Sequence, residues 1–177
     1  MDHADHVRLL RGGVTPGGTW ADLGAGTGAF TLALAELVGP GGDVIAVDRA
    51  PDALRELERS LRGGVATVRT ITADFTKPIE LPALDGIVMA NSLHFVNDKV
   101  PVLALVRAML KPSGRLVVVE YDGDRGNTWV PHPLSFDTWR ALADTNGFSG
   151  TRRLATVPSR FMGRIFSAMS EAAALHN

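Results

Sequence analysis

The sequence predicts an α/β fold built on a doubly wound, mostly parallel sheet. Short apolar segments rich in β-branched residues alternate with longer segments of helical periodicity. Such alternation is typical of parallel βαβ units joined by right-handed crossovers. A glycine-rich turn between the first expected strand and the next helix marks a ligand-binding edge. With 177 residues, the chain is long enough for one domain with a substantial core.

The first half of the chain carries signals for three helices and three strands. Glycine and proline clusters separate the segments, and Gly63-Gly64 is expected to end the third helix. Pro51 occupies the expected first position of that helix, where its missing N–H costs nothing. In chain order we expect a helix at 3–11, a strand at 19–23, a helix at 29–37, a strand at 43–48, a helix at 51–61 and a strand at 65–72.

The second half continues the alternation of strands and helices and then ends in an irregular segment, a helix and a hairpin. A break at Lys111–Gly114 is expected to separate a helix from a strand whose unbroken apolar run indicates burial on both faces. Residues 122–133 are irregular, and a hairpin turn is expected at Ser159–Gly163. The expected elements are a strand at 84–90, a helix at 98–110, a strand at 115–121, a helix at 135–146, and antiparallel strands at 151–158 and 164–170.

The segment Asp22-Leu23-Gly24-Ala25-Gly26-Thr27-Gly28 is the most informative motif. An acidic residue ends a strand, and three glycines follow at alternate positions before a helix begins. Bare glycines let a ligand approach backbone N–H groups and a helix N-terminus, so we expect side chains at Gly24, Gly26 or Gly28 to block it. The spacing is tighter than the G-x-G-x-x-G pattern of dinucleotide sites.

Acidic residues follow the next two strands, at the edge where open α/β sheets bind ligands. Asp48 ends the second strand, and its carboxylate can accept hydrogen bonds from ribose hydroxyls. The alternative for Asp48 is a turn carboxylate at the start of a helix. Asp74 and Phe75 follow the third strand and offer an acceptor and an apolar wall to an adenine ring. Their alternative is a loop aspartate beside a core phenylalanine.

Together these segments resemble the class I S-adenosylmethionine-dependent methyltransferases. The resemblance covers about residues 18–170 and is carried by Asp22–Gly28, Asp48, Asp74, Asn91–Phe95 and Lys111–Tyr121. It implies a Rossmann-like, seven-stranded sheet in the order 3-2-1-4-5-7-6, with an antiparallel terminal strand. We therefore expect a single methyltransferase domain over 1–177, with an N-terminal segment at 1–18 and the core at 19–170.

The resemblance also implies S-adenosylmethionine as the cofactor and a role for each motif. The backbone at Gly24 and Gly26 contacts the methionine portion, with Asp22 near its amine, and Asn91 contacts the same end through its backbone. Asp48 holds the ribose and Asp74 the adenine amine. The expected cofactor residues are Asp22, Gly24, Ala25, Gly26, Gly28, Asp48, Arg49, Asp74, Phe75 and Asn91.

His94 is the first candidate for a general base, because it follows the fourth strand and its unperturbed pKa lies near neutrality. The alternative is a loop histidine that shapes the pocket, since methyl transfer also proceeds by proximity alone. Glu120, Tyr121 and His132 are weaker candidates. Tyr121, Trp129 and His132 are expected near the acceptor, although Trp129 and His132 can equally dock their irregular segment on the sheet.

The overall composition limits which partners and which kinds of chemistry are expected. A net charge of −1 gives no overall attraction to nucleic acid or membranes, and the absence of cysteine removes disulfides and thiol catalysis. We expect a cytoplasmic protein without a metal, and we keep a homodimer as a possibility because a second copy could cover the site. Four arginines near the end are read as a solvated face, with a nucleic-acid patch as the alternative: Arg152, Arg153, Arg160 and Arg164.

The leading functional hypothesis is methyl transfer to a small molecule by in-line displacement. No Asn/Asp-Pro-Pro-aromatic motif follows the fourth strand, which argues against nucleobase nitrogens as acceptors. One alternative is a module that binds the cofactor without transferring its methyl group, and another is an RNA or protein methyltransferase. A nicotinamide oxidoreductase is disfavoured by the glycine spacing and by the lack of a Tyr-x-x-x-Lys pair.

Overall fold

A computed structural model describes residues 1–61, 63 and 65–173. The strands are β1 (Thr19–Leu23), β2 (Asp43–Asp48), β3 (Thr67–Thr72), β4 (Leu84–Ala90), β5 (Leu110–Tyr121), β6 (Phe148–Ser159) and β7 (Gly163–Ala172). The helices are α1 (His3–Arg11), α2 (Ala29–Val38), α3 (Pro51–Ser60), α4 (Val100–Met109) and α5 (Phe136–Thr145), with a 3-10 turn η1 (Leu93–Phe95).

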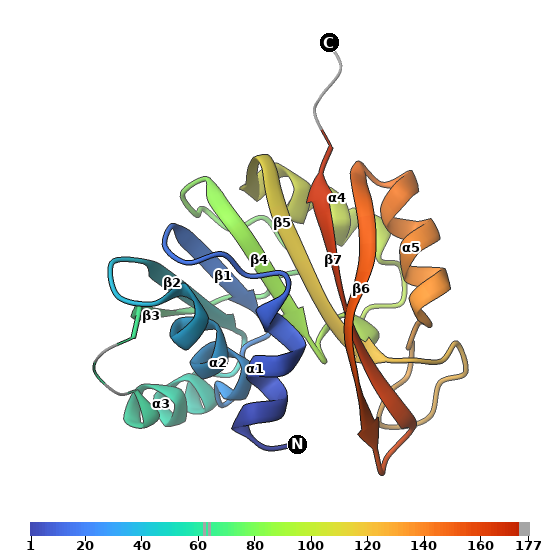
Figure 1. Ribbon diagram of the computed structural model, residues 1–177, viewed down its shortest axis with the longest axis horizontal. Helices are drawn as coiled ribbons and strands as arrows, with labels where there is room; N and C mark the ends of the chain where they lie inside the picture. Colours follow the sequence, from blue (N-terminus) through green and yellow to red (C-terminus); the bar gives the residue numbers. More distant parts are fainter. Residues whose placement is uncertain (62, 64, 174–177) are drawn as a thin grey trace.

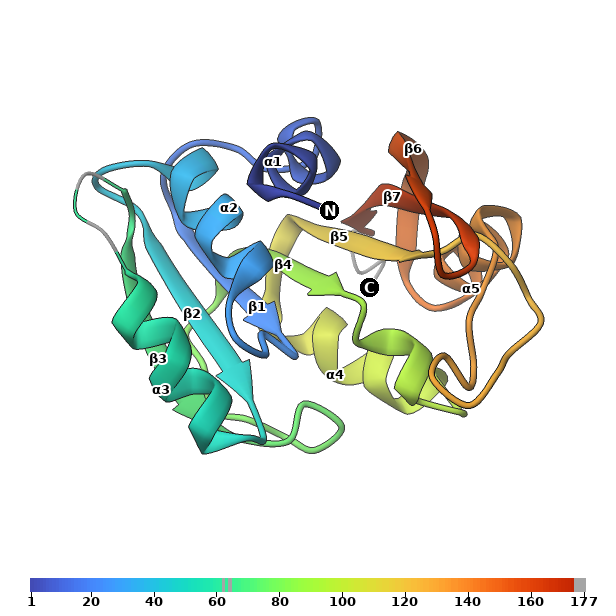
Figure 2. The same ribbon diagram turned by 90° about the horizontal axis from the view of Figure 1, so that it is seen from below.

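All seven strands form one sheet in the order β3-β2-β1-β4-β5-β7-β6 (Figure 1). The strands from β3 to β5 pair in parallel, whereas β7 is antiparallel to both β5 and β6. The predicted order and the antiparallel terminal hairpin are therefore confirmed. The carboxyl ends of β1, β2 and β4 lie at one edge, toward which Figure 2 looks.

Helices cover both faces of the sheet, and each face has its own apolar core. On one face, α4 and α5 contribute Leu103 and Trp139 to a cluster that includes Leu116 and Val118 of β5. On the other face, α1 and α2 pack against the alternate β5 residues, including Val117. The predicted burial of β5 on both faces is confirmed, because successive side chains of a strand point to opposite faces.

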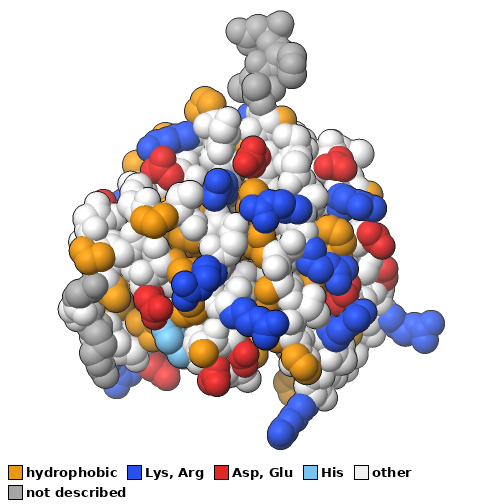
Figure 3. Space-filling model, viewed as in Figure 1, with side chains coloured by type: hydrophobic (Ala, Val, Ile, Leu, Met, Phe, Trp, Pro, Cys, Tyr) orange, Lys and Arg blue, Asp and Glu red, His pale blue; other side chains and the backbone are white. Residues whose placement is uncertain are grey.

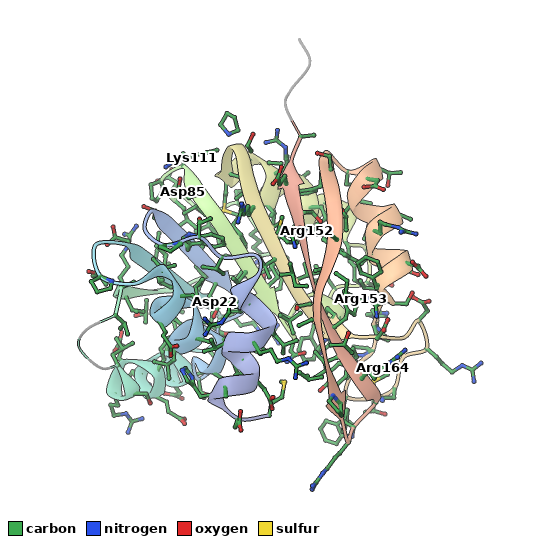
Figure 4. The ribbon with its side chains drawn as sticks, viewed as in Figure 1. Asp22, Asp85, Lys111, Arg152, Arg153 and Arg164 are labelled. Carbon is green, nitrogen blue, oxygen red and sulfur yellow. The ribbon has the colours of Figure 1, made fainter. Side chains whose placement is uncertain are left out.

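The predicted break at Lys111–Gly114 is wrong in one respect, because β5 already begins at Leu110. Leu110 pairs with Leu84 and Arg115 with Gly86, so residues 111–114 form an irregularity within a continuing ladder. The ion pair between Lys111 and Asp85, 2.9 Å from Nζ to Oδ1, holds this irregularity against β4 (Figure 4). Pairing with a neighbouring strand has overridden the local turn signal.

Other boundaries shift by a few residues. The helix expected from residue 98 begins at Val100, because the Asp98 carboxylate accepts a hydrogen bond from the Val100 amide at 3.1 Å. The third strand begins at Thr67 instead of residue 65, and both hairpin strands are longer than predicted. The third helix ends at Ser60, whereas Gly64 of the expected stop signal lies outside the described residues.

Candidate functional site

A cavity of about 370 Å³ lies beyond the carboxyl ends of β1, β2 and β4. It brings together seven of the ten predicted cofactor residues, whereas Asp22, Ala25 and Gly28 are absent from its wall. The lining residues are Gly24, Gly26, Asp48, Arg49, Ala73, Asp74, Phe75, Thr76, Asn91, Ser92, Phe95 and Val96. Seven of the predicted residues therefore lie together at one cavity, and their binding of the cofactor stays a prediction.

The glycines of the loop after β1 are each required for a different structural reason. Gly24 and Gly26 have φ values of 86° and 54°, which disfavour any other residue. A Cβ at Gly24 would lie 2.5 Å from the Cβ of Ser92, so Gly24 permits contact between two loops. A Cβ at Gly26 would meet no atom within 4 Å, so the space beside this residue belongs to the cavity.

Gly28 corrects one expectation from the sequence. It is not on the cavity wall, and a Cβ there would collide with Leu57 of α3. Its φ of 92° makes it the residue at which the chain turns into α2. The bare backbone at Gly28 therefore serves the packing of α3 against the start of α2, and the blocking effect predicted for a side chain there is not supported by this geometry.

Asp48 lies on the cavity wall at the end of β2. Its carboxylate accepts hydrogen bonds from the amides of Gly26 and Ala50, each at 2.8 Å. These bonds fix the glycine loop to the end of β2 and use one acceptor position on each oxygen. Because an ionised carboxylate has further acceptor positions, Asp48 can still bind hydroxyl groups in the cavity.

Asp74 lies on the cavity wall after the end of β3, beside Phe75. Its Oδ1 accepts from the hydroxyl and the amide of Thr76, at 2.7 and 2.9 Å, and these bonds lower the pKa of the Asp74 carboxyl. The residue is therefore charged at neutral pH. Among the described residues no hydrogen bond reaches Oδ2 of Asp74, which leaves this oxygen as an acceptor for a ligand.

Asn91 follows β4 in a strained backbone conformation, with φ of 52°. Its amide donates to the Val119 carbonyl at 2.8 Å, which fixes the backbone at the end of the strand. Its side-chain Oδ1 is buried and has no hydrogen-bond partner. A buried, unpartnered polar atom on a cavity wall is typical of a ligand site.

A second hollow of about 360 Å³ adjoins the cavity and shares Asn91 and Phe95 with it. Its wall is mostly aromatic. The lining residues are Asn91, His94, Phe95, Tyr121, Trp129, Val130 and Phe161. We call this space the aromatic hollow.

His94 lies at the base of the aromatic hollow and is held by Glu120. The Nδ1 of His94 lies 2.7 Å from Oε2 of Glu120, and both side chains are buried. The other Glu120 oxygen accepts from the amides of Leu93 and His94 at 3.0 and 3.1 Å. An ionised carboxylate can only accept, so contact with an ionised Glu120 favours the tautomer of His94 that carries its proton on Nδ1 and leaves Nε2 as an acceptor.

His132 is placed by its backbone. Its amide donates to the His94 carbonyl at 3.0 Å, and its own carbonyl accepts from Nζ of Lys99 at 2.9 Å. Its side chain lines neither the cavity nor the aromatic hollow. His132 therefore fixes the irregular segment onto the turn after β4, and its predicted contact with the acceptor gains no support from the structure.

Comparison with known proteins identifies the family. Residues 15–148 match the family model described as a methyltransferase domain. The chain belongs to the class I S-adenosylmethionine-dependent methyltransferase family. Membership implies a transferase that takes its methyl group from S-adenosylmethionine.

Two further comparisons agree with this family. The ubiquinone/menaquinone biosynthesis C-methyltransferase UbiE of Burkholderia mallei is 31% identical over 132 residues, which are 74% of this chain and 53% of that protein. The chain thus spans about half the length of the curated relatives it matches. A methyltransferase structure from Aquifex aeolicus matches with a TM-score of 0.75 at 21% identity, over 96% of this chain and 90% of that one.

The same fold occurs in more distant structures. The YcgJ protein of Bacillus subtilis matches with a TM-score of 0.78 at 14% identity, over 97% of this chain and 100% of that one. Human N-acetylserotonin methyltransferase, solved in complex with S-adenosylmethionine, matches with a TM-score of 0.67 at 20% identity, over 88% of this chain and 48% of that one. At these identities the similarity shows the fold alone.

The residues of the cavity fit the family's cofactor. The open space beside Gly26 leaves room for a ligand against the backbone, and Asp48 and Asp74 offer acceptors on the cavity wall. The unpartnered Oδ1 of Asn91 lies between the cavity and the aromatic hollow. Within the described ranges, no cluster of three or more His, Asp or Glu side chains forms a metal site.

Several site residues escaped the sequence analysis. Ser92, whose hydroxyl donates to the Leu23 carbonyl at 2.8 Å, joins the turn after β4 to the end of β1. Phe161 reaches the aromatic hollow from the tip of the terminal hairpin, far away in sequence. Glu120 was considered only as a base. Ser92 lies within the Asn91–Phe95 segment of the family resemblance, although no role was predicted for it. Nothing in the local sequence indicates where Phe161 lies.

Proposed function

We propose that this chain transfers a methyl group from S-adenosylmethionine to a small molecule held in the aromatic hollow. The observation that carries this proposal is the contact between two spaces, because the cofactor cavity and the aromatic hollow share Asn91 and Phe95. S-adenosylmethionine supplies an electrophilic methyl group when it is bound. The chain's own task is to hold both molecules with the reacting atoms in line.

We assign cofactor binding to the loop at Gly24 and Gly26 and to the carboxylates of Asp48 and Asp74. Asp48 binds the ribose hydroxyls, Asp74 accepts from the adenine amine through Oδ2, and Phe75 packs beside the ring. Asn91 binds the methionine end. Asp22, Ala25 and Gly28 do not line the cavity, so their contact with the cofactor, including that of Asp22 with its amine, stays a prediction.

His94 is our candidate for the general base. It lines the aromatic hollow, and the carboxylate of Glu120 fixes its tautomer so that the lone pair of Nε2 is available. Glu120 would also stabilise the imidazolium that forms when His94 takes a proton from an acceptor. Glu120 thereby acts as a positioning residue for His94 and not as the base itself.

We infer that three of the four terminal arginines, Arg152, Arg153 and Arg164, are structural. Figure 3 shows Lys and Arg side chains on the half of the molecule that holds β5, β6 and β7. Arg152 donates to the Gly12 carbonyl at 3.1 Å, and Arg153 and Arg164 lie 3.5 and 3.7 Å from the Asp122 carboxylate (Figure 4). These contacts favour a small-molecule acceptor over RNA.

Two expectations about the whole protein stay predictions. A homodimer and a cytoplasmic location rest on the sequence arguments alone. None of the helices in the described part of the chain is long and apolar enough to cross a bilayer.

Calorimetric titration with S-adenosylhomocysteine, followed by a methyl-transfer screen, tests the proposed function. Gly26→Val should abolish binding, since the side chain fills the cavity, whereas Gly41→Val should bind normally. Gly41 has a similar positive φ of 89° and open space beside it, but it lies outside the cavity. Equal binding by both variants would contradict the assignment, and binding without any methyl transfer would favour a non-catalytic module.

The same titration tests the ribose assignment. Asp48→Ala should weaken binding by about 1.5–3 kcal/mol, the scale for losing hydrogen bonds to a charged group. Asp52→Ala is the matched control, because that carboxylate is exposed on α3 and lies outside the cavity. If Asp48→Ala and Asp52→Ala bind S-adenosylhomocysteine like the unaltered chain, Asp48 does not hold the ribose.

A further inference from the structure

The aromatic hollow concentrates exposed apolar side chains. Phe95, Trp129 and Phe161 are 62%, 72% and 51% exposed, and they are three of the five exposed large apolar side chains among the described residues. They come from the turn after β4, from the irregular segment and from the hairpin tip, and all three line the same hollow. An exposed apolar patch that surrounds a few polar side chains is typical of a ligand site.

The exposed position of Trp129 is fixed by hydrogen bonds. The side-chain oxygen of Asn127 accepts from the amides of Trp129 and Val130 at 2.8 and 2.9 Å. The backbone amide of Asn127 donates to the Val130 carbonyl at 3.0 Å, which closes the turn. An ordered backbone therefore holds an indole in solvent, where its burial by a ligand would be favourable.

The residue types that line the aromatic hollow indicate which class of ligand fits it. Among the described residues, no Asp, Glu, Lys or Arg side chain lines the aromatic hollow. Its polar groups lie on Asn91, His94, Tyr121 and the indole N–H of Trp129, and the ring centroids of His94 and Tyr121 are 5.8 Å apart. Burial and the nearby Glu120 charge raise the pKa of the Tyr121 hydroxyl, which is therefore neutral at neutral pH. These groups suit an uncharged ring that carries a hydroxyl group.

We propose that the aromatic hollow is the acceptor site and that it takes a flat, uncharged aromatic compound whose hydroxyl group points toward Nε2 of His94. This inference rests on the proposed function. The aromatic side chains contact the ring, which favours a planar molecule over a saturated one. The acceptor's O–H bond breaks as the Nε2–H bond forms, the electron pair stays on the acceptor oxygen, and Glu120 balances the charge on His94.

Binding of 4-nitrophenol to the full chain tests the proposal, since its phenolate form is distinguished by its yellow absorbance. Calorimetry should show binding that Trp129→Ala and Phe161→Ala each weaken roughly tenfold. Both side chains are more than half exposed, so these variants should fold. Val100→Ala is the matched control, because Val100 is an exposed apolar residue of α4 outside the hollow, and this variant should bind like the unaltered chain.

The ionisation of bound 4-nitrophenol tests the role of His94. The unaltered chain should increase the phenolate fraction over that in buffer at the same pH. His94→Gln should lose this increase while it still binds the neutral form, because glutamine can donate to Glu120 but cannot take the proton. An unchanged phenolate fraction in His94→Gln would overturn the orientation of the hydroxyl toward His94.

Two further probes distinguish the ligand class. Cyclohexanol should fail to displace 4-nitrophenol, and phenyltrimethylammonium should bind more weakly than 4-nitrophenol. Equal displacement by cyclohexanol would reveal a general apolar surface, tighter binding of phenyltrimethylammonium would reveal a cation site, and equal 4-nitrophenol binding by the alanine variants would place the site elsewhere. Each of these results overturns the proposal.

A parallel titration with S-adenosylhomocysteine separates this inference from the proposed function. Trp129→Ala and Phe161→Ala should bind S-adenosylhomocysteine like the unaltered chain, because neither residue lines the cofactor cavity. Loss of 4-nitrophenol binding with intact S-adenosylhomocysteine binding supports a separate acceptor site. Failure of the unaltered chain to bind S-adenosylhomocysteine refutes the cofactor assignment, whatever the result with 4-nitrophenol.

Discussion

Asp22 is buried on β1 (Figure 4). Its Oδ2 accepts a hydrogen bond from the Thr31 hydroxyl at 2.6 Å, whereas Oδ1 has no partner. Burial is the main cause that raises the pKa of Asp22 to about 6, and the charge of Asp48 adds to it. At neutral pH the fold therefore contains a buried charge that is only partly compensated.

The raised pKa of Asp22 makes stability depend on pH in a defined direction. Because the folded chain binds this proton more tightly than the unfolded chain, the free energy of unfolding falls as pH rises from about 4 to about 6. The shift from 3.8 to about 6 corresponds to a loss of about 3 kcal/mol, complete above the folded pKa.

Asp22→Asn should remove this pH dependence, because the amide oxygen can still accept from Thr31 and carries no charge. Denaturant unfolding between about pH 4.5 and about pH 7.5 should show the unaltered chain losing about 2 kcal/mol relative to the variant. Asp52→Asn, which changes an exposed carboxylate, should follow the unaltered chain. Parallel profiles for Asp22→Asn and the unaltered chain would refute the shifted pKa.

At the scale of elements, the sequence predicts most of the sheet because each strand is an apolar run between glycine and proline clusters. The start of β5 was missed because Lys111–Gly114 has the local composition of a turn, whereas pairing with β4 decides its structure. Asp48 and Asn91 were predicted at this edge because Asp48 ends one strand and Asn91 directly follows another. The position of Phe161 depends on how the hairpin curves over Tyr121, which no local pattern encodes.

Lys99 joins two elements of the site that are distant in sequence. Its Nζ donates to the carbonyls of Val96 and His132, at 2.8 and 2.9 Å, and the side chain is 8% exposed. Burial lowers the pKa of the Lys99 amine. These two bonds hold the irregular segment, with Trp129, over the turn that carries His94.

Lys99→Met should therefore loosen that segment while preserving most of the buried volume. Loss of two hydrogen bonds to buried carbonyls should lower the free energy of unfolding by about 1–3 kcal/mol. Hydrogen exchange at the His132 amide, which is bonded to the His94 carbonyl, should become faster. Lys77→Met is the exposed control, and unchanged exchange at His132 in Lys99→Met would contradict this role of Lys99.

At the scale of the whole molecule, one sheet edge gathers both parts of the site. The cofactor cavity is built from the carboxyl ends of β1, β2 and β4, and the aromatic hollow is completed by the irregular segment and the β6–β7 hairpin. The irregular segment contributes Trp129 and Val130 to the hollow, and the hairpin tip contributes Phe161. The assignment of residues 1–177 to one methyltransferase domain stays a prediction, since the matched part of the chain covers only 53% of the curated relative.

A crystal structure grown with S-adenosylhomocysteine tests the central claim most directly. The account predicts that the ribose hydroxyls contact the Asp48 carboxylate and that the sulfur atom lies beside Asn91 and Phe95, facing the aromatic hollow. Electron density for the nucleoside elsewhere on the chain, or a sulfur atom turned away from His94, would contradict the account.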